Sequence, residues 1–169
     1  MKQAYARHAS QTAIDLEFDN LYRELSSYGA GPAFSVHRNG TDSAAYAAGS
    51  YQKVLFTTAE YDTHKQFDLA LSRFEPRNSG LYQLNAAAYF NPGQDNKDYL
   101  IAIYKNGVVY KQITNNCASA IAVSIDISTL VRVVSPGDYY EIFVLHNFTT
   151  STVLSGGTSL TYFNGCRIG

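Results

Sequence analysis

Residues 56–84, FTTAEYDTHKQFDLALSRFEPRNSGLYQL, decide the fold. Within this stretch, residues 67–71 alternate large apolar side chains with small or polar ones, a period of two that predicts a strand with one buried face. Residues 75–80 then form a cluster of turn formers, in which a Pro removes a hydrogen-bond donor and a Gly allows a positive φ. Along residues 82–90, every second side chain is apolar and falls on one side of a second predicted strand. Two strands and a loop therefore bring several aromatic rings toward one core.

Seven anchor residues of this stretch have a characteristic spacing, with five, four, six, five, one and one residues between them. These anchors are Phe56, Asp62, Phe67, Phe74, Gly80, Tyr82 and Leu84. The pattern resembles the signature of the C1q-like domain, the trimeric jelly roll shared with tumour necrosis factor (TNF) ligands. The resemblance implies the fold strongly and the function weakly, because one fold hosts many activities.

Two later stretches extend the resemblance, which covers about residues 33–168. The matching positions are Gly137 and Asp138 in a turn, and Phe163 and Gly165 in the closing strand. The chain departs from the family pattern at Leu84, where the family usually has Phe, and at Ala86, where it usually has another aromatic. Both residues are smaller than the usual ones, so we expect a neighbouring aromatic ring to fill the space.

The fold class expected is mainly β: a C1q/TNF-like jelly-roll sandwich of eight to ten antiparallel strands in residues 31–169. Short apolar runs separated by turn signals support this, most clearly the hairpin signal Lys105-Asn106-Gly107. Residues 41–50 are rich in small side chains and predict a loop over the end of the domain. The further predicted strands are residues 32–38, 51–56, 99–104, 108–113, 120–134, 139–145 and 158–168.

A short N-terminal helical arm is expected in residues 1–30, ahead of the jelly-roll head. Its apolar seam repeats at heptad spacing through Ile14, Phe18, Leu21, Leu25 and Tyr28. A helix of this length is too short to be stable alone in water, so it must dock. It packs either on its own domain or in a three-stranded bundle or assembly socket, and the trimeric family favours the second interpretation. We therefore assign trimerisation and virion attachment to this arm.

Residues 15–22, DLEFDNLY, resemble the Asp-x-x-Phe-Asn-x-Leu-Tyr segment near the start of many tail and fibre proteins of bacterial viruses. Residues 1–10 carry charge but no apolar core follows, and no collagen repeat is present, whereas secreted C1q relatives typically carry a signal peptide and a collagen repeat. We expect a non-enzymatic homotrimer of a bacteriophage tail fibre or appendage that is assembled in the host cytoplasm. Its arm contacts other virion proteins, and its head binds host surface polysaccharide or protein.

Two other functions stay open on the sequence. The first is a purely architectural head or tail decoration or connector, and the second is a secreted C1q/TNF-like ligand. The formal net charge of −1, with Lys and Arg scattered, gives no reason to expect a nucleic-acid partner. The apolar-rich stretch at residues 113–131 is interrupted by Asn, Ser and Asp, so we expect no membrane insertion.

No catalytic template occurs, so we expect no enzyme activity, cofactor or metal. Cys117 and Cys166 predict free buried thiols, with a single bridge left open. Asp95 and Asp98 could hold a hard cation, but a solvated loop is the better interpretation. The four histidines are far apart in the sequence and predict surface or hydrogen-bonded strand residues.

The 14 tyrosines suit either subunit contacts or sugar recognition, because each ring has a polar tip. Tyr139 and Tyr140 are adjacent, so a strand places their rings on opposite sides and only one can enter the core. One face of some strands is therefore expected to be a subunit interface. Saccharide stacking would need one or two rings exposed at the far end of the trimer.

Overall fold

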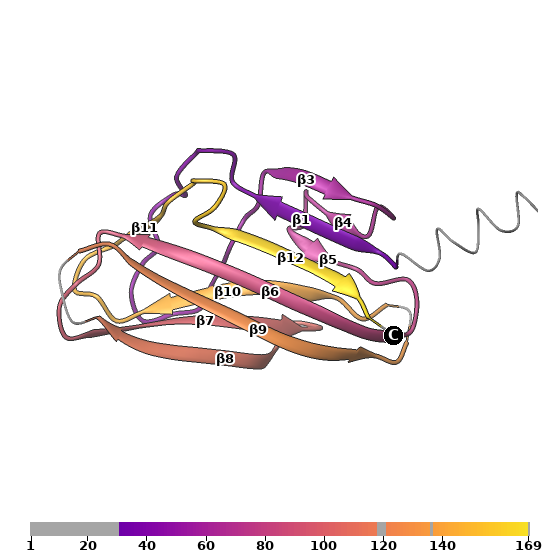
Figure 1. Cartoon of the computed structure of the whole chain (residues 1–169). Helices are drawn as coiled ribbons and strands as arrows, with labels where there is room; N and C mark the ends of the chain where they lie inside the picture. The colour runs from indigo at the N-terminus through magenta and orange to yellow at the C-terminus, as the bar shows by residue number, and fades with distance from the viewer. Residues whose placement is uncertain (1–30, 118–120, 136, 169) are drawn as a thin grey trace, which may run out of the picture. The chain divides into compact units, whose positions relative to one another are not determined.

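The computed structural model describes residues 31–117, 121–135 and 137–168, which form twelve strands in two antiparallel sheets (Figure 1). The strands are β1 (Ala33–His37), β2 (Gln52–Lys53), β3 (Thr58–Asp62), β4 (Phe67–Asp68), β5 (Arg73–Phe74), β6 (Gly80–Asn91), β7 (Lys97–Lys105), β8 (Val108–Cys117), β9 (Val123–Val133), β10 (Tyr140–His146), β11 (Val153–Leu154) and β12 (Tyr162–Arg167). This is the mainly β sandwich that the sequence predicts. The predicted helical arm, with its seam of Ile14, Phe18, Leu21, Leu25 and Tyr28, lies outside the described residues.

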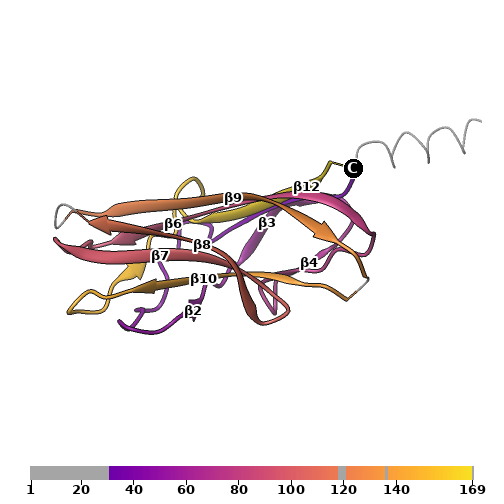
Figure 2. The ribbon, with the colours of Figure 1, turned by 90° about the horizontal axis from the view of Figure 1, so that it is seen from below.

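The two sheets form two layers (Figure 2). In the first sheet β12 lies between β6 and β1, β3 pairs with the other side of β1, and β9 and β11 also pair with β6. In the second sheet the order is β4, β5, β10, β7 and β8, with β2 pairing β10. Strands far apart in the chain are therefore neighbours, as in β1 and β12. Such crossovers are typical of a jelly roll.

The core lies between the layers and follows the alternation of each strand. On β6, the side chains at every second position from Tyr82 to Phe90 are buried, as the sequence predicts. The second sheet contributes Ile101 and Ile103 from β7 and Ile142 from β10. Burying each large apolar side chain stabilises the fold by about 1.5–3 kcal/mol. The inward face of β6 is therefore the centre of the hydrophobic core.

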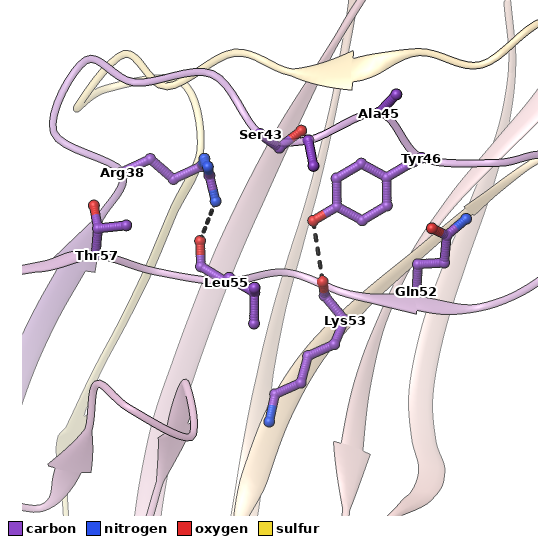
Figure 3. Close-up of a pocket in the computed structure, with 9 residues that line it drawn as sticks. Arg38, Ser43, Ala45, Tyr46, Gln52, Lys53, Leu55 and Thr57 are labelled. Atoms are coloured by element: carbon purple, nitrogen blue, oxygen red, sulfur yellow. Dashed lines mark hydrogen bonds between the residues drawn. The ribbon is translucent and has the colours of Figure 1, made fainter.

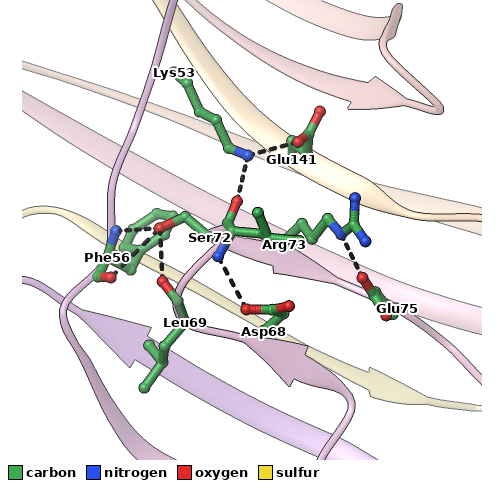
Figure 4. Close-up of polar contacts among 9 residues, drawn as sticks. Lys53, Phe56, Asp68, Leu69, Ser72, Arg73, Glu75 and Glu141 are labelled. Atoms are coloured by element: carbon green, nitrogen blue, oxygen red, sulfur yellow. Dashed lines mark hydrogen bonds and ion pairs between the residues drawn. The ribbon is translucent and has the colours of Figure 1, made fainter.

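The strand predicted at residues 67–71 is wrong, because the chain turns after two residues and returns as β5. Local hydrogen bonds explain the turn. The Asp68 carboxylate accepts the Leu71 N–H at 2.9 Å, and the Ser72 hydroxyl accepts the Phe56 N–H at 3.0 Å (Figure 4). Short polar side chains that bond nearby backbone compete with strand formation. Leu71, expected on the buried face, is 46% exposed.

The other strand predictions agree with the structure within a few residues, and the hairpin of β7 and β8 lies at the predicted turn. Among the described residues there are twelve strands rather than eight to ten, because β3, β5 and β11 were not predicted; of these, β5 and β11 have only two residues each. Segments this short leave almost no periodic signal in a sequence. The predicted loop at residues 41–50 is a loop, with one isolated bridge between Tyr46 and Thr152.

Candidate functional site

The aromatic anchors of residues 56–84 come together around a ring that the sequence analysis did not single out, Phe34 of β1. Its ring stacks on Phe74 with centroids 4.5 Å apart and on Phe67 at 5.3 Å, and meets Phe163 edge-on at 4.9 Å. Phe56 contacts the same group through Phe67 and Phe163. These side chains form the packed core at one end of the sandwich.

Leu84 and Gly165 are directly coupled in this cluster. They are cross-strand neighbours on β6 and β12. A methyl group added at Gly165 would lie 2.6 Å from Leu84 Cδ2 and 2.9 Å from Phe34 Cε1. Glycine therefore leaves the room in which Leu84 and the Phe34 ring pack, and Phe34 is the neighbouring aromatic beside the shortened residue.

Three further signature residues lie in turns or at the strand ends beside them. Asp62 accepts the backbone N–H of Gln66 at 3.0 Å and of Phe67 at 2.8 Å. Gly137 has a φ of 106°, and Gly80 begins β6 with a φ of 150°. Asp62 thus closes the turn before β4, and the glycines adopt backbone angles that other residues rarely adopt.

Asp138 fixes the end of the β7–β8 hairpin. Its carboxylate pairs with Lys105 Nζ at 2.9 Å and accepts the Asn106 amide at 2.9 Å. The hydrogen bond from Lys105 holds the pKa of Asp138 below its ordinary value and raises the pKa of Lys105. The signature residues in the described part of the chain thus stabilise the core and the turns.

The loop that follows β1 has two arms, residues 38–46 and residues 52–57. A pocket of about 430 Å³ lies between these arms (Figure 3). It is lined by Arg38, Ser43, Ala44, Ala45, Tyr46, Gln52, Lys53, Leu55 and Thr57. The first arm runs beside residues 152–156: the Gly40 N–H donates to the Gly156 carbonyl at 2.6 Å, and the Tyr46 N–H donates to the Thr152 carbonyl at 2.7 Å. The loop is therefore held by backbone hydrogen bonds on its outer side.

Arg38 joins the two arms of this loop. Its Nε donates to the Thr41 carbonyl at 3.1 Å, Nη2 donates to the Asp42 carbonyl at 3.1 Å, and Nη1 donates to the Leu55 carbonyl (Figure 3). The side chain lies in the wall of the pocket, yet the residue is only 7% exposed. The sequence shows Arg38 only as the last residue of a predicted strand, so no pattern singles it out.

Tyr46 and Lys53 form the opposite wall. The Tyr46 hydroxyl donates to the Lys53 carbonyl at 3.0 Å. Burial raises the pKa of Tyr46, while the positive charge of Arg38 acts in the opposite direction. The Lys53 side chain runs away from the Tyr46 ring and pairs with Glu141 at 2.6 Å (Figures 3 and 4). Lys53 therefore contributes backbone and stem to the pocket, and its charge is neutralised elsewhere.

A second hollow of about 260 Å³ contains one ion pair within its lining. It is lined by Arg73, Glu75, Pro76, Arg77, Gly137, Asp138 and Tyr139. Arg73 pairs with Glu75 and lies 4.8 Å from the centroid of the Tyr139 ring. Tyr139 faces this hollow while Tyr140 is fully buried. The two rings therefore lie on opposite sides of the chain, as the sequence predicts.

One side of the sandwich exposes strand edges together with apolar side chains. Within the described residues, β8 pairs only with β7 and β9 pairs only with β6, and the two free edges approach each other (Figure 1). The exposed apolar residues along them are Val108, Val109, Tyr110, Ile113 and Leu130. We call this set the β8/β9 edge. Free strand edges with apolar side chains are typical of contact surfaces.

The outer face of the first sheet has an uncharged amide network at its centre. The Asn85 amide donates to Asn164 Oδ1 at 3.0 Å, and the Ser128 hydroxyl lies 2.8 Å from both Asn85 Oδ1 and Gln83 Nε2. The network is flanked by the half-buried rings of Tyr89 and Tyr162. Tyrosine is enriched at the centres of many interfaces, while the exposed Asp126 of β9, in register with Ala87 of β6, places one charge on this face.

The other features considered in the sequence are the two cysteines, possible metal ligands, membrane-spanning segments and the aspartates of one loop. Cys117 is buried and Cys166 is exposed, and neither forms a disulfide, although both were expected to be buried. No group of three or more His, Cys, Asp or Glu that could hold a metal occurs in the described residues. In the same part of the chain, no helix has the length and apolar character needed to span a membrane. Asp95 and Asp98 lie in and beside an exposed turn.

Comparison with solved structures defines the class of fold. The globular domain of zebrafish complement 1qA protein matches with a TM-score of 0.58 at 17% identity, over 82% of this chain and 98% of that chain. Eiger TNF from S. frugiperda matches with a TM-score of 0.60 at 10% identity, covering 82% and 94%. Murine APRIL gives a TM-score of 0.59 at 10% identity, covering 82% and 99%. The fold is the C1q/TNF jelly roll.

A curated relative adds a distant link to phage-like proteins. The chain is 25% identical over 140 residues to the phage-like element PBSX protein XkdV of Bacillus subtilis strain 168. The match covers 76% of this chain and 20% of the length of that protein, so the chain spans about a fifth of its relative. No protein-family model matches the sequence.

Proposed function

We propose that the chain is a homotrimeric component of a bacteriophage or phage-like particle, in a tail fibre or appendage, that binds the surface of the host cell. One observation carries the particle context: the similarity over 140 residues to a protein of a phage-like element. The action proposed is binding rather than turnover. The protein would be found in the virion, assembled in the host cytoplasm.

Two different surfaces support the trimer. The β8/β9 edge carries exposed apolar side chains, and the outer face of the first sheet carries the amide network flanked by Tyr89 and Tyr162. When one surface meets a different surface on the next copy, the contact is heterologous and closes a ring if the rotation allows. A threefold ring built this way would cover both surfaces in every copy.

We assign residues 1–30 to an attachment arm and residues 31–169 to the head. The heptad seam of the arm supports a role in trimerisation and in contacts with other virion proteins. Three heads on one axis would present three copies of any binding site. Weak individual sites then gain avidity on a surface that repeats its ligand.

Binding of the labelled full chain to bacterial cells tests this proposal. We expect saturable binding to at least one of a panel of bacteria that includes Bacillus subtilis strain 168, the organism of the curated relative. Competition by unlabelled chain should remove the signal. A chain that ignores every cell wall yet is retained by other virion proteins would contradict host attachment and support the architectural alternative.

A further inference from the structure

Arg38 is a buried charge without a carboxylate partner among the described residues. It is 7% exposed, and the acceptors of its three hydrogen bonds are the neutral carbonyls of Thr41, Asp42 and Leu55. The ion pairs in the described part of the chain are Lys53–Glu141, Arg73–Glu75 and Lys105–Asp138. Buried charges are normally paired, because carbonyl groups solvate a cation without neutralising it. Arg38 is therefore an exception that needs an explanation.

The acidic groups near the pocket are engaged elsewhere. The Asp42 carboxylate accepts the backbone N–H of Gly156 at 2.8 Å. Glu141 pairs with Lys53 at 2.6 Å and so neutralises the other cation of the lining. The lining itself therefore carries the positive charge of Arg38 and no acidic side chain, while the Asp42 carboxylate, one residue outside the lining, keeps its charge and is turned to the Gly156 N–H.

The pocket also offers neutral donors and apolar surface. Three of the five guanidinium N–H groups are used in the described contacts, which leaves two as donors. Ser43 Oγ accepts the Leu154 N–H at 2.8 Å, so its hydroxyl hydrogen remains to be donated. Ala44, Ala45 and the exposed Leu55 supply apolar contact. A volume of about 430 Å³ lies at the lower end of ligand pockets and suits one sugar residue.

We propose that this pocket binds a single sugar residue that carries an anionic group, a carboxylate or a phosphate, with the anion on the free N–H groups of Arg38. The inference rests on the proposed host-surface function and names the ligand class for it. Ser43 donates to the anion or to a neighbouring hydroxyl, and Ala45 borders the site. In the trimer three such pockets would engage a repeating acidic polysaccharide.

Titration of the full chain with sugars, followed by the backbone amide NMR signals of the pocket loop, tests the proposal directly. The probes are D-glucuronate, a phosphate monoester of D-glucose, and D-glucose itself. We expect one or both anionic sugars to shift the amide signals of residues 43–46, with affinity about tenfold or more above that of D-glucose. Equal affinity for all three probes, no binding of either anionic sugar, or equal binding of inorganic phosphate alone would overturn the proposal.

A charge placed at the mouth of the pocket gives a variant that leaves the hydrogen bonds of Arg38 intact. Ala45 is exposed and lines the pocket. Ala48 is also exposed and lies on the same loop, but it is outside the pocket lining. Ala45→Glu should weaken binding of the anionic sugar by about tenfold or more, because like charges repel. The control Ala48→Glu, with the same net charge, should bind as the unmodified chain does. Equal effects of both substitutions would contradict a site at Arg38.

These measurements separate the pocket from the wider function. Cells that bind Ala45→Glu as well as the unmodified chain would remove the pocket from host attachment and leave attachment itself standing. Sugar binding by NMR in a chain that attaches to no cell would keep the pocket and contradict the host-attachment role.

Discussion

His146 Nε2 lies 3.0 Å from the backbone carbonyl oxygen of Tyr46, a hydrogen bond that ties the pocket loop to the core strand β10. The other ring nitrogen, Nδ1, accepts the Phe148 N–H at 3.2 Å. Together these partners require the neutral tautomer with its hydrogen on Nε2. The ring is 1% exposed, and burial lowers the pKa of His146, an effect that the hydrogen bond to Tyr46 opposes only in part.

Acid should therefore destabilise the fold through His146. The folded-state pKa is below the ordinary value of about 6.5, so between these two values the unfolded chain binds more protons than the folded chain. The free energy of unfolding then falls as the pH drops from about 6.5 toward the folded-state pKa. Urea unfolding at a series of pH values, at fixed protein concentration, measures this slope.

The variant His146→Asn provides the control for this slope. Asparagine can still accept the Phe148 N–H but cannot titrate, so the variant should be less stable at neutral pH and should lose the pH dependence in that window. A slope that persists unchanged in His146→Asn would assign the acid sensitivity to other groups.

Removing the carboxylate of Asp138 should loosen the hairpin of β7 and β8. The substitution Asp138→Ala deletes the ion pair with Lys105 and the hydrogen bond from Asn106, and we expect a loss of about 1–2 kcal/mol at neutral pH. The pKa of Asp138 is lowered in the fold, so this contribution is present above about pH 4 and is lost as the pH falls through the folded-state pKa. Asp95→Ala, at an exposed turn position, should change stability little.

Adding one methyl group at Gly165 should disturb the aromatic core. The new Cβ would lie 2.6 Å from Leu84 Cδ2 and 2.8 Å from the backbone oxygen of Gln83, and backbone cannot move aside cheaply. Gly165→Ala should cost about 1–3 kcal/mol as overpacking. Thermal unfolding compared with Cys166→Ala, an exposed neighbour, checks this. Equal stability of the two variants would show that the close approach of Leu84 to Gly165 is not a constraint.

A single charge on the β8/β9 edge should dissociate the proposed trimer. Leu130 is 52% exposed on β9, so Leu130→Asp leaves the core intact while placing a charge in the interface. Leu71→Asp is the matched control, since Leu71 is 46% exposed in the turn between β4 and β5. We expect a lower mass for the first variant and an unchanged mass for the second. Identical masses would remove Leu130 from the interface; because Leu130 is in register with Gln83 of β6, the same result would count against the adjoining amide network as well.

Much of the fold was predictable because it depends on period and spacing. The alternation from Tyr82 to Phe90 identifies the buried face of β6, and the turn at Asn106 and Gly107 marks the hairpin. The turn after Asp68 was not predictable, since its apolar alternation imitates a strand and side-chain hydrogen bonds to the backbone decide the outcome.

The pocket could not be found from the sequence, for a different reason. Arg38 directly follows β1, and its acceptors lie on both arms of the loop, so nothing local marks it as buried. Phe34 likewise looks like any strand aromatic, and only the pairing of β1 with β12 brings it against Phe163. Both residues depend on contacts between distant segments, which periodicity does not report.

The mass of the full chain in solution, measured by light scattering during size-exclusion chromatography, shows whether three copies associate. For a homotrimer we expect a single species with three times the 18.6 kDa mass of the chain. A monodisperse species with the mass of one chain, at concentrations where the fold is intact, would contradict it.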